Sequence, residues 1–272
     1  MDRNQKQKLQ LLANKIRKYV LKSIFEAGSG HPGGCLSAVD YLTYLYDCEM
    51  QIDPLDPLNI NRDRFILSKG HAAPALYAIL AVKGYFPVDD LKMLRKFDSY
   101  LQGHPNMNTT PGVDMTTGSL GQGISAAAGM AKGAKILAKD VNIYTLLGDG
   151  ELNEGQVWEA ILFAAHYKLD NLCIAVDVNG FQIDGSTKDI LNTEPLKDKF
   201  MAFGCSVISI DGHNFEEINQ AFDFFRSNSS KPTVILLKTV KGKGVSFMEN
   251  SVEWHGKAPT QEELESGIQE LE

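Results

Sequence analysis

Two short apolar runs near the middle of the chain flank a segment with helical periodicity. Residues 143–147 and 172–176 are mostly apolar, as expected of strands that are buried on both faces. Between them, residues 155–167 place apolar side chains three to four positions apart, which predicts an amphipathic helix. A strand, a helix and a second strand in this order predict a right-handed parallel unit.

The same alternation continues on both sides of this unit. Apolar spacing predicts further helices over residues 9–24, 37–48, 72–82, 88–97, 124–138 and 214–225, and from about residue 261. Further strands are predicted at residues 64–68, 207–210 and 234–237. The chain is therefore expected to form an α/β fold with a mainly parallel sheet and helices on both faces. No repeat or linker interrupts the pattern, so residues 1–272 are interpreted as a single domain with a C-terminal tail.

Histidines occur in segments that are rich in Gly and Pro. The first helix is expected to stop at Gly28, and His31 follows on a loop that Pro and Gly make rigid. His71 follows the strand at residues 64–68 and lies beside a helix N-terminus, where anions bind readily. These histidines are therefore candidates for ligand binding. His166 and His213 are interpreted as structural.

For three other segments the sequence leaves the secondary structure or the role open. Residues 98–120 are irregular, and a loop of this length within a compact domain is typically functional. Residues 180–193 contain the turn residues Asp184-Gly185-Ser186 and are predicted to form a loop or a short hairpin. The helix at residues 124–138 is rich in Ala and Gly. It could be buried against its own sheet or in contact with another protein chain, and the sequence leaves both open.

Composition narrows the class of protein. The formal net charge of −7 disfavours nucleic acid and anionic membranes as partners, so any phosphorylated ligand must be held by local features such as a metal ion and backbone N–H groups. No apolar stretch is long enough to span a bilayer, and the N-terminus lacks a signal-peptide core. The four cysteines are widely spaced, as in a reduced protein, so a cytoplasmic location is expected.

Oxygen-bearing side chains follow the two central strands. Asp149 comes directly after the run at 143–147, and Asn179 comes shortly after the run at 172–176. Because ligands bind outside the carboxyl ends of parallel strands, these side chains are expected to converge there. Carboxylate and amide oxygens suit Mg²⁺, which takes its remaining ligands from water and phosphate. The alternative is that Asp149 only caps the following helix.

Several motifs occur together and carry a family resemblance. Gly148-Asp149-Gly150 is followed after 28 residues by Asn179. The accompanying strings are SGHPG (29–33), SKGHA (68–72), GHP (103–105), TGSLGQG (117–123), ELNEG (151–155) and WHG (254–256). Together they resemble the thiamine diphosphate enzymes, and within these the transketolases, over about residues 10–260. Family members often have two adjacent asparagines, whereas this chain has Val178-Asn179.

The resemblance implies a role for each matching residue. The implied metal ligands are Asp149, Asn179 and the main-chain carbonyl of Phe181. The implied thiamine diphosphate contacts are His71, Gly118, Ser119, Leu120, Gly150, Glu154, Asn179 and His255. His31, His104 and His255 would face the sugar substrate and shuttle protons, which suits imidazole because its ordinary pKa is near neutrality. Leu120 as plain core and Glu154 as a solvated helix-start residue remain alternatives. Lys241 and Lys243 look like a mobile basic loop and are given no role.

The resemblance also implies a partner. It covers the diphosphate-binding domain of a transketolase, so the pyrimidine-binding domain and the C-terminal domain are expected on a second chain, in a heterotetramer with two copies of each. The implied reaction moves a two-carbon ketol unit from a ketose phosphate to an aldose phosphate, as in the pentose phosphate pathway. Two alternatives stay open: a half-enzyme similar to 1-deoxyxylulose-5-phosphate synthase or to the 2-oxo acid dehydrogenase alpha chain, and a non-catalytic regulatory subunit.

Overall fold

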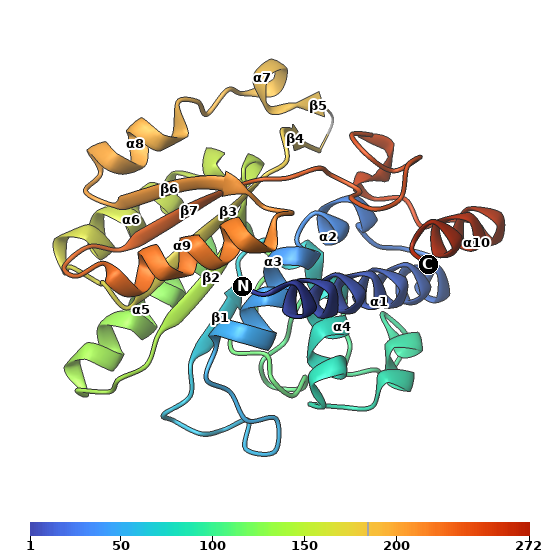
Figure 1. Ribbon diagram of the computed structural model, residues 1–272, viewed down its shortest axis with the longest axis horizontal. Coiled ribbons are helices and arrows are strands. Elements are labelled where there is room, and N and C mark those ends of the chain that lie inside the picture. Colours follow the sequence, from blue (N-terminus) through green and yellow to red (C-terminus); the bar gives the residue numbers. More distant parts are fainter. Residues whose placement is uncertain (184) are drawn as a thin grey trace.

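The computed structural model describes residues 1–183 and 185–272 (Figure 1). Five parallel strands form one sheet in the order β1-β2-β3-β7-β6. Their bounds are β1 Arg64–Leu67, β2 Ile143–Gly148, β3 Leu172–Val178, β6 Ser206–Asp211 and β7 Thr233–Lys238. All five contain a run predicted to be a strand, and the mainly parallel α/β fold is confirmed.

Helices cover both faces of the sheet, because alternate strand residues point to opposite sides. On β2, Tyr144 and Leu146 belong to one apolar cluster, whereas Ile143 and Leu147 belong to the other. The first cluster is covered by α1 Arg3–Ala27, α2 Pro32–Leu36, α3 Val39–Tyr44, α4 Ala73–Lys83 and α9 Phe215–Ser227. The second is covered by α5 Gln122–Ile136, α6 Gly155–His166 and α8 Leu196–Ala202. Figure 1 shows the sheet between α9 and the pair α5 and α6.

Local signals set the ends of several helices. Asp2 and Asn214 cap α1 and α9 by accepting backbone N–H bonds, and Gly28 ends α1 with φ +64°. The C-terminal helix α10, Gln261–Glu270, begins at a capping box formed by Thr260 and Glu263. These features explain why the predicted end of the first helix and the predicted starts of the helices at 214–225 and near 261 lie close to those observed. The first helix begins earlier than predicted, at Arg3, where Asp2 caps it.

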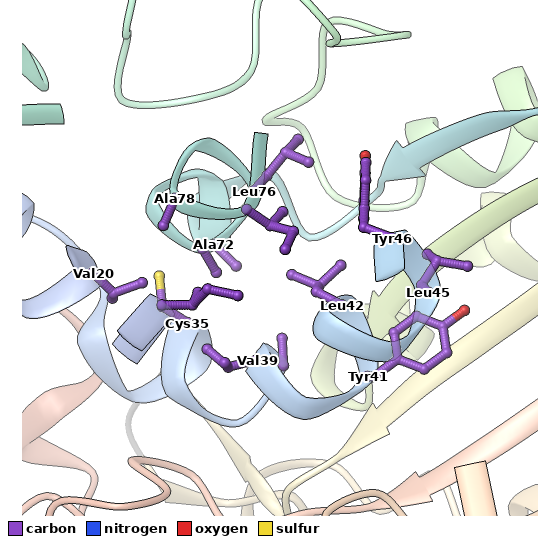
Figure 2. Packing of buried hydrophobic residues seen from close by; sticks show 14 of the residues in the cluster. Val20, Cys35, Val39, Tyr41, Leu42, Leu45, Tyr46, Ala72, Leu76 and Ala78 are labelled. Atoms are coloured by element: carbon purple, nitrogen blue, oxygen red, sulfur yellow. The ribbon is translucent and has the colours of Figure 1, made fainter. Parts of the chain in front are cut away.

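The segment after α1 departs from prediction. Residues 32–36 form the short helix α2 instead of a loop, because Pro32 occupies the first helical turn, where its missing N–H costs nothing. The helix predicted at 37–48 is split into α3 and a π-helical turn, η1 Leu45–Glu49. Figure 2 shows Cys35, Val39 and Leu42 of this segment packed towards Ala72 and Leu76. This packing holds His31 beside the exit of β1.

Other differences lie in short elements. Residues 88–93 form a 3-10 helix, η3 Val88–Met93, in place of the longer helix predicted, and α8 was not predicted. The expected hairpin exists as β4 Phe181–Gln182 paired antiparallel with β5 Gly185–Ser186, followed by α7 Thr187–Ile190. Asp184 lies outside the described residues. The remaining 3-10 turns are η2 Gly70–Ala72, η4 Gly150–Asn153 and η5 Glu253–His255.

The irregular segment at 98–120 covers the outer edge of β1. The Asp114 carboxylate accepts the Phe65 N–H at 2.8 Å, and the Thr117 hydroxyl donates to the Leu67 carbonyl at 2.7 Å. The segment therefore satisfies backbone groups that the edge strand would otherwise expose. It also places residues 118–120 at the carboxyl end of the sheet.

Helix α5 packs on its own sheet through Ile124, Ala127 and Ala131, so the first of its two interpretations, burial against its own sheet, is present in the fold. A Cβ added at Gly129 or Gly133 would meet open space. A contact of this outer face with another protein chain stays a prediction. Among the described residues, no helix is long and apolar enough to cross a membrane.

Candidate functional site

A cavity of about 190 Å³ opens at the carboxyl ends of the central strands. Its walls come from the turns after β1, β2 and β3 and from residues of the long segment that follows β7. Eight of the residues singled out in the sequence line it: His71, Leu120, Asp149, Gly150, Glu154, Asn179, Phe181 and His255. Residues separated by well over 100 positions thus meet where parallel strands are expected to bind ligands.

Asp149 is buried, with 2% of its surface exposed. Its Oδ1 accepts the Gly150 N–H at 2.9 Å and its Oδ2 accepts the Gly180 N–H at 2.7 Å. The residue caps η4, so the capping role left open in the sequence is present in the fold. Burial, together with the nearby Asp177 carboxylate, raises the pKa of Asp149 to about 7. A cation bound beside Asp149 would offset this unfavourable charge.

Asn179 is oriented by its neighbours. Its Nδ2 donates to Asp177 Oδ2 at 3.1 Å, and its Oδ1 accepts the Phe181 N–H at 3.1 Å. Rotating the amide by 180° would place its oxygen against the Asp177 carboxylate. The oxygen is therefore held on the side away from Asp177, where it is available as a hard ligand.

A buried ion pair lies beneath these groups and was not predicted. Lys69 donates to Asp177 and, at 2.8 Å, to the Gly34 carbonyl, while Ser37 donates to Asp177 at 2.6 Å and Thr239 donates to it as well. Although burial acts to raise the pKa of Asp177, Lys69 and these hydrogen bonds lower it below its usual value. Asp177 therefore stays charged and joins α2, β3 and the exit of β1.

Three histidines gather at one side of the cavity. The ring centroids of His31, His71 and His255 lie 5.3, 5.4 and 5.7 Å apart, pair by pair. Burial lowers the pKa of His31 to about 4, and it also lowers the pKa of His71. These two imidazoles are neutral at pH 7, so each can accept and donate a hydrogen bond.

His104 lies on the irregular segment, close enough to His31 to contribute to lowering its pKa. A Cβ at Gly118 would lie 3.2 Å from its ring, and burial followed by the charge of Arg95 lowers its pKa. His213, by contrast, accepts the Val240 N–H at Nε2 and contacts Asp40 at 2.7 Å through Nδ1. Its structural role is confirmed by these contacts.

The loop at residues 118–120 closes against the exit of β1. A Cβ at Gly70 would lie 2.8 Å from the Gly118 nitrogen, so the two backbones approach as closely as glycine allows. Leu120 is partly exposed and lines the cavity, which disagrees with the alternative that it is plain core. Ser119 is exposed and outside the cavity wall.

Two glutamates follow the Gly148-Asp149-Gly150 turn. Glu154 lines the cavity, is exposed and precedes the first residue of α6, so the solvated alternative remains compatible with its position. Glu151 was missed in the sequence. It is buried and accepts hydrogen bonds from Ser68 at 2.5 Å, from the Gly121 N–H at 2.9 Å and from the Gly148 N–H at 3.1 Å.

Lys241 was also missed. The expectation of a mobile basic loop is wrong for this residue, which is 2% exposed and has its Nζ 3.0 Å from His255 Nδ1. The Gly242 N–H donates to the Gly33 carbonyl at 3.0 Å and fixes the turn. Lys243 instead lies near Glu249 at 3.6 Å and is partly exposed. Only the folded chain distinguishes the two lysines.

The donor set fits a magnesium ion that carries phosphate. Among the described residues, no three His, Cys, Asp or Glu side chains form a metal-binding group. Asp149, the Asn179 oxygen and the Phe181 carbonyl would instead offer three oxygens, which Mg²⁺ accepts when phosphate and water complete its shell. The Gly150 backbone is closely approached, since a Cβ there would lie 2.7 Å from Gln182, and Lys241 adds a positive charge to the same cavity.

The lowered pKa of Lys241 predicts that anion binding at this cavity depends on pH. Burial and the charge of Lys69 lower this pKa to about 8. The affinity for inorganic diphosphate with Mg²⁺ is therefore expected to fall as the pH rises above 8, because the free chain loses this cation. Calorimetric titrations between pH 7 and 9.5 measure the effect. In Lys241→Met, the fall in affinity above pH 8 should disappear. The matched control Lys197→Met, at an exposed lysine, should behave like the unaltered chain. If Lys241→Met keeps the pH profile of the unaltered chain, Lys241 does not bind the anion.

Comparisons with known proteins agree with this geometry. Residues 8–271 match the family described as "Transketolase, thiamine diphosphate binding domain". The chain is 49% identical to "6-deoxy-6-sulfo-D-fructose transketolase subunit SqwG" from Clostridium sp. (strain MSTE9), covering 97% of this chain and 96% of that one. It is 40% identical to an apulose-4-phosphate transketolase subunit from Phocaeicola vulgatus, covering 97% and 93%.

Full-length transketolases match over part of their length. The chain is 42% identical to the rat transketolase and spans 42% of it. The transketolase structure from Leishmania mexicana superposes with a TM-score of 0.92 at 34% identity, with 95% of this chain and 40% of that chain covered. The structure from Campylobacter jejuni gives 0.92 at 37% identity, with 97% and 43% covered.

Proposed function

The chain belongs to the transketolase family, and on that premise we propose that it holds the diphosphate and the metal ion of thiamine diphosphate in a two-chain transketolase. The observation that carries this proposal is the cavity at the carboxyl ends of β2 and β3, where Asp149 and Asn179 meet three histidines and Lys241. Relatives of nearly the same length have the word subunit in their names, which supports a partner chain.

Each group at the cavity is assigned a part of the cofactor. Asp149, the Asn179 oxygen and the Phe181 carbonyl would hold Mg²⁺, while His71, Lys241 and the Gly150 N–H would bind the diphosphate oxygens. The backbone of Gly118, Ser119 and Leu120 would support the pyrimidine ring, and Glu154 would link this site to the neighbouring cofactor site. The bound cofactor would supply the carbanion chemistry by which a two-carbon unit leaves a ketose and joins an aldose.

The histidines are proposed to act on the sugar. His31, His104 and His255 would bind its hydroxyl groups and move protons, because neutral imidazoles are both donors and acceptors. The lowered pKa values of His31 and His104 keep these rings neutral at pH 7. Lys241, whose Nζ lies 3.0 Å from His255 Nδ1, would fix the orientation of that ring.

The donor and acceptor sugars are proposed to carry an anionic group at the end remote from the carbonyl. One relative is named for 6-deoxy-6-sulfo-D-fructose and another for apulose-4-phosphate, so both a sulfonated and a phosphorylated ketose belong in a substrate panel. We also propose a heterotetramer with two copies of each chain, a cytoplasmic location and a role in pentose phosphate metabolism.

The proposal is tested by adding the partner. The chain alone, with Mg²⁺ and thiamine diphosphate, is expected to bind the cofactor weakly and to show no ketol transfer, because the proposed active site needs a pyrimidine-binding domain. Co-purification from the native source, followed by the sugar panel on the complex, should restore transfer. Full transfer by the purified chain without a partner would contradict the two-chain proposal.

The same experiment separates the alternatives. Condensation of pyruvate with an aldehyde would favour a reaction like that of 1-deoxyxylulose-5-phosphate synthase, and decarboxylation of a 2-oxo acid with transfer to a lipoyl group would favour a dehydrogenase. A complex that binds no thiamine diphosphate would indicate a regulatory subunit. The names of the relatives and the histidines at the cavity favour ketol transfer.

A further inference from the structure

Arg95 has an unusual backbone conformation. It follows η3 with φ +60°, in the left-handed region that residues other than glycine rarely adopt. Its N–H donates to the Leu101 carbonyl at 2.8 Å, which closes the turn over residues 95–101. Backbone strain of this kind persists where the surrounding structure requires it, and it clusters at functional sites.

The guanidinium of Arg95 lies against the turn that carries His104. A Cβ added at Gly103 would lie 2.9 Å from Arg95 Cζ and 3.1 Å from both Nε and Nη2. Only glycine leaves room for the planar group there. The arginine side chain therefore packs under the residue that directly precedes His104.

No carboxylate among the described residues neutralises this charge. Within residues 1–183 and 185–272, the Arg95 guanidinium forms no ion pair, and its Nε is buried without a hydrogen-bond partner. A buried N–H of a cation is costly to leave unpaired, so packing alone is a poor reason to keep an arginine here. An apolar side chain of similar length would fill the same space.

The charge acts on the histidines predicted to face the sugar. Arg95 is close enough to lower the pKa of both His31 and His104, after burial as the main cause. His31 is also faced by His71, His255, His104 and Lys241, all of which are neutral or cationic. His104 has Arg95 as its charged neighbour.

We propose that Arg95 is a positioning residue, whose guanidinium supports the Gly103-His104 turn and keeps a fixed positive charge beside His104 and His31. Its effect is to add to the effect of burial, so that both imidazoles stay unprotonated to lower pH and each accepts a proton from a sugar hydroxyl. This consequence for the reaction rests on the proposed function. The placement of the charge itself is independent of any cofactor.

The test is a titration of the six histidines of the full chain by NMR, compared with that of Arg95→Met. Without the positive charge, the pKa values of His31 and His104 are expected to rise by about one pH unit. Arg95→Lys keeps the charge and should restore lower values at least in part. The matched control Arg3→Met removes an exposed arginine at the start of α1 and should leave both histidines unchanged.

A second variant tests the packing and remains informative if Arg95→Met does not fold. Gly103→Ala places a methyl group 2.9 Å from Cζ and should move the guanidinium while the net charge is kept. The pKa of His104 should then rise in the same direction as in Arg95→Met, but by less, because the charge is displaced and not removed. The proposal is overturned if neither variant changes the His31 or His104 titration.

Activity of the complex with its partner gives a separate readout. In Arg95→Met, the acid limb of the pH profile should move to higher pH by the same amount as the histidine pKa values, with cofactor affinity unchanged. If the complex binds no thiamine diphosphate but the histidines still shift, the proposed function fails and the placement of Arg95 is supported. If the complex binds cofactor and the acid limb does not move, the role of Arg95 is wrong.

Discussion

Asp149→Ala is expected to lower the affinity of the chain for thiamine diphosphate in the presence of Mg²⁺ by about 100-fold or more, close to 3 kcal/mol. The substitution removes the only carboxylate among the proposed metal ligands, so the ion loses both a ligand and the charge that attracts it. It also removes the acceptor of the Gly150 and Gly180 N–H groups, which shape the diphosphate site. Calorimetric titration with the cofactor, with and without Mg²⁺, measures the loss.

Two further variants make the result specific to the metal. Asp149→Asn keeps the shape and one oxygen acceptor but removes the charge, so it should retain the fold and still lose most of the Mg²⁺-dependent affinity. The exposed Asp198→Ala on α8 should bind like the unaltered chain. Unchanged binding in both Asp149 variants would show that the metal lies elsewhere.

Lys69→Met is expected to destabilise the folded chain by about 3–5 kcal/mol, because it leaves Asp177 as a buried charge without its cation. The two side chains are 1% and 0% exposed, and Lys69 also donates to the Gly34 carbonyl, so the substitution removes several buried contacts at once. Urea denaturation followed by circular dichroism measures the change in the free energy of unfolding. The exposed Lys197→Met should change it by less than about 0.5 kcal/mol.

A double variant distinguishes the ion pair from simple loss of packing. Lys69→Met with Asp177→Asn removes both charges, so its destabilisation should be clearly smaller than the sum of the two single effects. Additive effects would indicate that the two groups contribute independently. The same variants should weaken metal binding, because Asp177 orients the Asn179 amide at 3.1 Å.

Much of the fold could be predicted because its signals are local. The strands at 143–148 and 172–178 were recognised from apolar runs, and the helix between them from a spacing of three to four residues. The segment at 32–36 was misjudged because Pro and Gly were taken to exclude a helix, whereas Pro is well suited to the first turn. Local sequence patterns are ambiguous for a residue such as proline, which can either end a helix or occupy its first turn.

The residues of the candidate site likewise fall into those that local motifs indicate and those that only the folded chain reveals. Asp149, Asn179 and the histidines could be proposed from motifs, because a chemistry that needs these residue types places them in short glycine-bounded strings at strand ends. Lys69 and Glu151 lie within such strings, at 68–72 and 151–155, but the motifs assign them no role, and Lys241 and Arg95 were given none either. Each is an ordinary charged residue in sequence, and its role depends on partners that only the fold brings close, such as Asp177 for Lys69 and His255 for Lys241.

The sequence by itself therefore determined the order of the main strands and helices along the chain and the family, and it supplied the residues proposed to touch metal and cofactor. Only the tertiary structure decided which charges are buried and what neutralises them. The physical reason is that burial and pairing depend on segments from the whole chain meeting at one edge of the sheet. The free energy of a charge is set by those neighbours and by the exclusion of water, and neither can be obtained from local sequence.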